Sequence, residues 1–136
     1  MNAARPYLPL PELHLVGVAD PGKPNLERIV IRPTQQLNLN GYGLAVGVSA
    51  GAAGASPIFD NCFWFPAIVV QPPSWVLIYT GPGEQRSSDW QGEAVLNLHW
   101  QRKFTVFTLE FLVPVLFRVE GAAVGQLLTP PYRLTQ

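Results

Sequence analysis

The chain has 136 residues, of which 48% are hydrophobic and 13% charged, with nine basic residues balancing nine acidic ones. This length suits one domain that buries roughly two-thirds of the surface of its unfolded chain, so no disulfide or metal is needed to hold it together. Such a composition excludes a disordered chain, and without a basic stripe nucleic-acid binding is not expected. A surface with so few charges favours self-association or burial against a partner.

Cys62 is the single cysteine, which excludes an intramolecular disulfide and a cysteine metal cluster. A lone thiol fits a reducing compartment and slightly favours the cytoplasm. We recognise no signal peptide in residues 1–18, because prolines interrupt the apolar run. The longest apolar segment, 104–119, is short for a membrane span and is interrupted by Glu110 and Pro114, so no membrane span is predicted. The sequence also leads us to predict no metal and no cofactor.

The predicted elements are short strands, because fourteen prolines and twelve glycines divide the chain and no clean helical periodicity survives between them. In chain order, the predicted strands are 12–18, 27–32, 37–39, 42–48, 63–70, 75–80, 93–100, 104–109, 111–119 and 124–128. The main turns and loops between them are 20–25, 40–41, 49–57, 72–74, 84–92 and 120–121. This spacing indicates an all-β, antiparallel β-sandwich in a single domain, although a barrel gives a similar pattern.

Residues 63–81 (FWFPAIVVQPPSWVLIYTG) raise the question of whether their aromatic side chains form core or a ligand platform. Because side chains alternate along a strand, Phe63 and Phe65 point one way and Trp64 the other. In a sandwich, Phe63, Phe65, Val76 and Ile78 would interdigitate between the two sheets, each large ring burying roughly 150–250 Å². We therefore expect core, with the prolines at 72–73 making the corner.

Four segments occur in an order that resembles a known family. They are 25–32 (NLERIVIR), 37–44 (LNLNGYGL), 63–81 and the pair His99–Trp100 followed by 118–124 (RVEGAAV). This order resembles the lamin-tail domain family, whose members are immunoglobulin-like β-sandwiches. The resemblance implies a sandwich over 12–128 with an N-terminal extension at 1–11 and a C-terminal tail at 129–136. It also implies binding to proteins or other macromolecules.

The sequence differs from that family in places. Tyr42 stands where the family has tryptophan, and Pro73 where it has glycine after the corner proline. The segment 110–117 (EFLVPVLF) is far more apolar than the glycine-aspartate turn of the family.

No catalytic residues are predicted. His14 and His99 are the two histidines, about 85 residues apart in sequence. A small hydrolase, the second alternative, would require one of them to meet a loop acid: Asp60, Asp89 or Glu93. A nucleophilic Cys62 would need a nearby base, and a buried, inert thiol is the expected state.

Trp90 is the best candidate for a binding residue, because it stands in a polar stretch with Arg86 and Asp89. A tryptophan folded back onto the edge of the sandwich is an equal alternative. If the four tryptophans instead formed coplanar exposed rings, the domain would be a carbohydrate- or small-ligand-binding sandwich, the first alternative.

The apolar run holding Phe111, Val113, Val115 and Phe117 is the second candidate surface. Pro114 favours an edge strand or bulge there, and an apolar edge must be covered to avoid aggregation. We therefore expect these residues to contribute to a homo-oligomer interface. Taken together, the sequence predicts a non-enzymatic interaction or scaffold module that binds a protein or another macromolecular partner.

Overall fold

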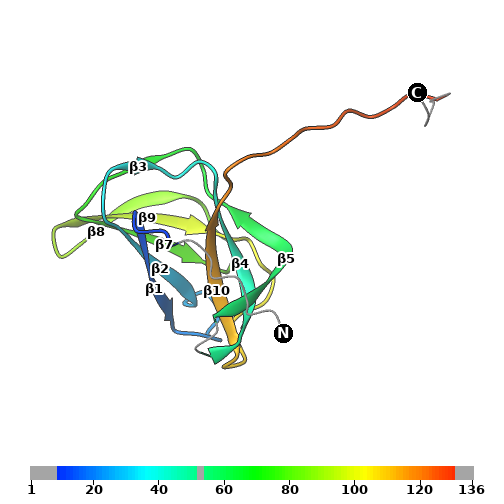
Figure 1. Cartoon of the computed structure of the whole chain (residues 1–136). Helices are drawn as coiled ribbons and strands as arrows, with labels where there is room; N and C mark the ends of the chain where they lie inside the picture. Colours follow the sequence, from blue (N-terminus) through cyan, green and yellow to red (C-terminus); the bar gives the residue numbers. More distant parts are fainter. Residues whose placement is uncertain (1–8, 52–53, 131–136) are drawn as a thin grey trace.

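The structure is a computed structural model that describes residues 9–51 and 54–130 (Figure 1). Ten strands and no α-helix lie in this part of the chain. The strands are β1 (Leu13–Ala19), β2 (Arg28–Pro33), β3 (Leu37–Asn38), β4 (Tyr42–Ser49), β5 (Ala55–Trp64), β6 (Val69–Val70), β7 (Ser74–Tyr79), β8 (Arg86–Trp90), β9 (Glu93–His99) and β10 (Leu112–Arg118). The predicted all-β sandwich is confirmed. No helix among these residues is long and apolar enough to cross a membrane.

Two sheets face each other across the core (Figure 1). One is five-stranded in the order β1-β2-β7-β9-β8, and the other is three-stranded in the order β10-β4-β5. A separate β3–β6 pair contributes Val70 to the core, and the core residue Leu39 follows β3 directly. All strand pairs are antiparallel except β7 and β9, which run parallel.

The core follows the two-residue alternation of the strands. Its fully buried aliphatic side chains come from both sheets and the β3–β4 turn: Ile29, Ile31, Leu39, Leu44, Val76 and Ile78. Phe65 is buried, and the ring of the half-buried Phe63 meets it edge-on at 5.1 Å between centroids. Trp64 between them points away and is 57% exposed. The expectation that the aromatic stretch builds core is therefore confirmed, with Trp64 as the predicted exception.

The segment 84–92, predicted as a loop, contains the edge strand β8. β8 and β9 form a hairpin whose two turn residues, Gln91 and Gly92, both have positive φ, as a two-residue type I′ turn requires. The hairpin places β9 between β8 and β7, which explains the parallel β7–β9 pair. All five residues of β8 are exposed, so no apolar alternation marked it in the sequence.

Two predicted strands are absent. Residues 104–109 form a looping segment, held by hydrogen bonds from the amides of Val106 and Phe107 to the Glu27 carboxylate. Residues 124–128 leave the sandwich as an extended tail, where the Leu127 side chain is 99% exposed (Figure 1). The apolar residues of both segments suggested strands, but neither segment pairs with a neighbouring strand.

The sequence also predicted a loop at 49–57 and extensions at the two chain termini. The predicted loop at 49–57 is shorter than expected because β5 begins at Ala55, and residues 52–53 lie outside the described part. The predicted strand at 63–70 is wrong in its bounds, because residues 63–64 end β5 and only 69–70 form the next strand, β6. Of the predicted extension at 1–11 and tail at 129–136, residues 1–8 and 131–136 lie outside it as well.

Candidate functional site

The outer face of the five-stranded sheet carries a groove of about 390 Å³, called here the outer groove. Side chains that alternate with the core residues of β2, β7 and β9 point to this face. The aliphatic side chains in the groove are Val30, Leu77 and Val95, and Val95 is buried. The centre of the outer groove is therefore apolar, and aromatic and charged side chains surround this centre.

Trp75 is fixed firmly at one end of the outer groove. Its Nε1 donates a hydrogen bond to Glu93 Oε1 at 2.9 Å, and the Arg32 guanidinium lies 4.0 Å from its ring centroid. Arg32 in turn makes two hydrogen bonds to Glu93, of 3.0 and 3.2 Å. Hydrogen bonds from Arg32 and then from Trp75 hold the pKa of Glu93 below its ordinary value. This network orients Trp75 before any ligand arrives.

Tyr79 lies at the other end of the outer groove. The ring of His99 stacks on it with centroids 5.2 Å apart, and the Arg28 guanidinium lies 5.9 Å from the Tyr79 centroid. Arg28 also forms an ion pair with Asp20 at 2.8 Å. Trp75 and Tyr79 are four residues apart on β7, so the ends of the groove are separated by roughly 13 Å.

The three residues predicted for binding, Trp90, Arg86 and Asp89, all line the outer groove. Trp90 is 54% exposed, and its ring stands nearly perpendicular to that of Trp75, at 87° with centroids 5.8 Å apart. It is thus folded against the sheet on one side and open on the other. Neither Arg86 nor Asp89 has an ion-pair partner among the described residues. The structure brings these residues together, and their role in binding stays a prediction.

The arrangement predicted for a hydrolase is not formed in the described residues. His99 and Glu93 occupy opposite ends of β9, roughly 20 Å apart at the rise of a strand. His14 is exposed on β1, and neither histidine lines the cavities that contain Asp60 and Asp89. Burial raises the pKa of the Cys62 thiol, which opposes a nucleophilic role. The described part of the chain also holds no cluster of three or more potential metal ligands.

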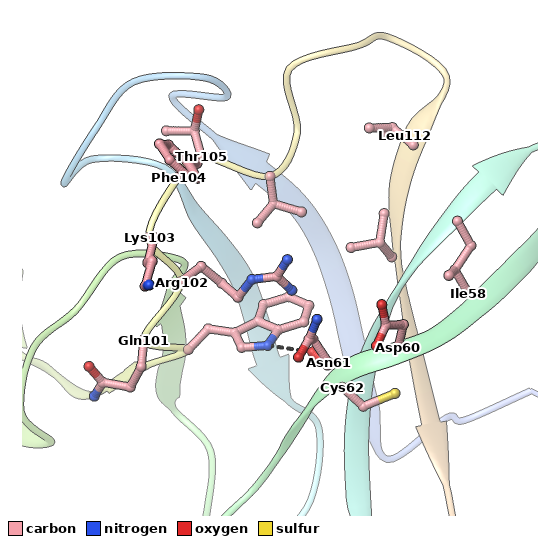
Figure 2. Close-up of a pocket in the computed structure, with 13 residues that line it drawn as sticks. Ile58, Asp60, Asn61, Cys62, Gln101, Arg102, Lys103, Phe104, Thr105 and Leu112 are labelled. Carbon is pink, nitrogen blue, oxygen red and sulfur yellow. Dashed lines mark hydrogen bonds between the residues drawn. The ribbon is translucent and has the colours of Figure 1, made fainter.

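A second cavity, of about 770 Å³, opens between the two sheets and is called here the inter-sheet cavity (Figure 2). It is lined by β5 and by the segment that follows Trp100. Trp100 Nε1 donates a hydrogen bond of 2.8 Å to the carbonyl oxygen of Asn61, which joins the two walls. Sequence reasoning missed this site because it treated 104–109 as a strand, and no local pattern places 101–106 beside 58–62.

The predicted interface residues lie on the three-stranded sheet. Val113, Val115 and Phe117 share its outer face, since they alternate with Leu112 and Leu116, which pack against the core. Phe111 immediately precedes β10 and is 48% exposed. The Phe117 ring meets that of Trp64 edge-on, with centroids 5.4 Å apart.

No family model, no curated protein and no solved structure matches this chain. The resemblance to lamin-tail domains therefore stays a prediction.

Proposed function

We propose that the protein is a non-enzymatic binding module that holds a protein partner in the outer groove. The observation that carries this proposal is Trp90, half-exposed and held edge-on to Trp75, beside the ion-pair-free Arg86 and Asp89. Tryptophan, tyrosine and arginine are the residue types that dominate binding energy at protein interfaces. The partner would place an apolar side chain on Val30 and Leu77 and an acidic group against Arg86.

The occupied faces of the aromatic rings favour a protein over a carbohydrate. A sugar stacks flat on a free ring face, and a longer glycan needs several such faces in one plane. Arg32 covers one face of Trp75, and His99 stacks on Tyr79. The 87° angle between the rings of Trp75 and Trp90 differs from the coplanar arrangement that the carbohydrate alternative calls for, which supports a protein partner.

An affinity pull-down tests the proposal, with the immobilised protein exposed to an extract of its native source. Trp90→Ala should lose at least one protein that the wild type retains, with about a tenfold or greater loss of affinity for that protein once it is purified. Leu26→Ala is the control, because Leu26 is 51% exposed and lies in the turn before β2, outside the outer groove and the apolar face of the three-stranded sheet. Its retained set should equal that of the wild type.

Two results would argue against this proposal. One is identical retention by the wild type and Trp90→Ala. The other is a glycan array in which the wild type binds sugars and Trp90→Ala does not, since that result would move the function to the carbohydrate-binding alternative.

A further inference from the structure

The inter-sheet cavity combines an apolar wall with two cationic side chains, Arg102 and Lys103. Val46, Ile58 and Leu112 supply aliphatic surface from β4, β5 and the start of β10. Figure 2 shows the guanidinium of Arg102 reaching across the cavity toward β5, whereas Gln101 points the other way. The guanidinium lies 5.6 Å from the centroid of the Trp100 ring. The cavity is thus amphipathic, with its positive charge inside the opening.

Arg102 differs from the arginines that stabilise the fold. Arg28, Arg32 and Arg118 each form an ion pair with a carboxylate. Arg102 is half-buried, yet among the described residues no carboxylate oxygen lies within ion-pair distance of it, and no side-chain or backbone oxygen accepts a hydrogen bond from its guanidinium. Its five N–H donors are available to a ligand in the fork geometry that suits a carboxylate.

The wall that carries Arg102 is held in place on both sides. The amide of Arg102 donates to the carbonyl of Thr80 at 2.8 Å, and Trp100 is tied to Asn61. Further along, the amides of Val106 and Phe107 donate to the buried Glu27 carboxylate. A ligand would therefore meet a largely pre-formed site, of the size and mixed polarity typical of small-molecule pockets.

We propose that the inter-sheet cavity binds a small amphipathic monoanion, with its carboxylate on Arg102 and its apolar chain against Val46, Ile58 and Leu112. Asp60 and Lys103 also line this cavity, and their opposite charges offset each other. The lining therefore has one net positive charge, which favours a ligand with a single negative charge. This site is separate from the outer groove, and the inference does not depend on the protein partner proposed there.

Calorimetric titration with octanoate, octanol and octylamine, below the concentrations at which they aggregate, tests the inference. Octanoate should bind the wild type at least tenfold more tightly than the other two. Arg102→Gln should weaken octanoate binding about 10- to 100-fold, the range expected for a hydrogen-bonded charge. Arg86→Gln, the same change in the outer groove, should leave it unaltered. Asp60→Asn should strengthen it a few-fold, since it removes a like charge.

A measurement on the wild-type protein keeps the inference testable if Arg102→Gln does not fold. In NMR spectra, octanoate should shift the indole N–H signal of Trp100 and leave that of Trp90 unmoved. The inference is overturned if octanoate does not bind at millimolar concentration, if octanol binds as well as octanoate, or if the Trp100 signal stays in place.

Discussion

Glu27 shows how a single residue organises this fold. Its side chain is 1% exposed, and its two oxygens accept hydrogen bonds from the amides of Gly22, Val106 and Phe107 and from the Thr80 hydroxyl. Burial acts to raise the pKa of Glu27, but these hydrogen bonds together outweigh it and hold the pKa below its ordinary value. The charged carboxylate thereby fastens the segment after β9 to the turn before β2.

Glu27→Gln should destabilise the protein by about 2–3 kcal/mol, because one oxygen becomes an NH₂ donor that faces amide donors inside the protein. Urea unfolding followed by tryptophan fluorescence measures the change. Glu84→Gln is the control, since Glu84 is exposed, and it should change stability by less than about 0.5 kcal/mol. Equal stability of Glu27→Gln and the wild type would contradict this role.

Stability should fall with acid for the same reason. Glu12 has a lowered pKa too, mainly through the hydrogen bond from the Tyr42 hydroxyl. For a lowered folded-state pKa, the stabilisation is complete above the unfolded value, near 4.5, and is lost as pH falls through the folded one. Thermal unfolding midpoints should be level near pH 6 and drop below about pH 4.5. Glu27→Gln should make that drop shallower, and an unchanged slope would contradict the assignment.

For single residues, the sequence indicated which side chains are exposed better than it indicated which groups they contact. For Trp90, an exposed ring and a ring folded back onto the edge of the sandwich were equal alternatives, and the structure combines them: the residue is 54% exposed and its ring lies against Trp75. The role of Glu27 could not be predicted, because two of the three amides that it binds are 79 and 80 residues away in sequence. Arg102 was missed likewise, since a cation without a partner has no signature in a single sequence.

At the scale of elements, β4 and β10 fit together through glycine. Gly43 pairs with Phe117, and a Cβ atom on Gly43 would lie 2.5 Å from that ring. Gly43→Val should therefore destabilise the protein by about 1–3 kcal/mol through overpacking. Thermal unfolding measures it against Gly121→Val, where nothing lies within 4 Å of an added Cβ. If both variants unfold at the same temperature, β10 does not pack on Gly43.

The edge of β10 has consequences for self-association. The amide of Ser49 donates to the carbonyl of Phe111, and the amide of Val119 donates to that of Gly41. Since ladder bonds alternate, odd-numbered residues bond to β4 and Pro114 faces the free edge. A proline there blocks strand addition. Self-association would therefore use the outer face of the three-stranded sheet, not its edge.

The predicted homo-oligomer is tested by sedimentation velocity over a range of concentrations. The wild type should form a discrete oligomer, and Val113→Lys should dissociate it, because the lysine places a charge on the apolar outer face. Ser56→Lys, on the exposed part of β5, is the control and should leave the oligomer intact. A monomeric wild type at high concentration would contradict the prediction.

Strands with strong alternation were predicted nearly to the residue, as 27–32 is against β2 (Arg28–Pro33). β8 was missed because an edge strand exposed on both faces has no apolar period. Residues 104–109 were predicted as a strand because apolar residues that cover the end of a sandwich resemble those that pair within it. The alternation of apolar residues thus indicates that one face of a segment is buried, but it does not indicate which strand lies beside that segment.

At the scale of the whole molecule, three surfaces stand apart on one sandwich. The outer groove lies on the five-stranded sheet, and the apolar face lies on the three-stranded sheet. The inter-sheet cavity opens between the layers (Figure 2). The sequence predicted the sandwich, because turn spacing and alternation are local. It could not predict the strand order or the parallel β7–β9 pair, which depend on contacts between distant segments.

We propose that the outer groove is the surface that meets a protein partner. Photo-crosslinking can test this, with a photoreactive side chain placed at Ser88 in the groove or at Ser56 on the opposite sheet. We predict a crosslinked partner from position 88 that is lost when Trp90→Ala is added, and none from position 56. Crosslinking from position 56 alone, or crosslinking from position 88 that persists in Trp90→Ala, would contradict the claim.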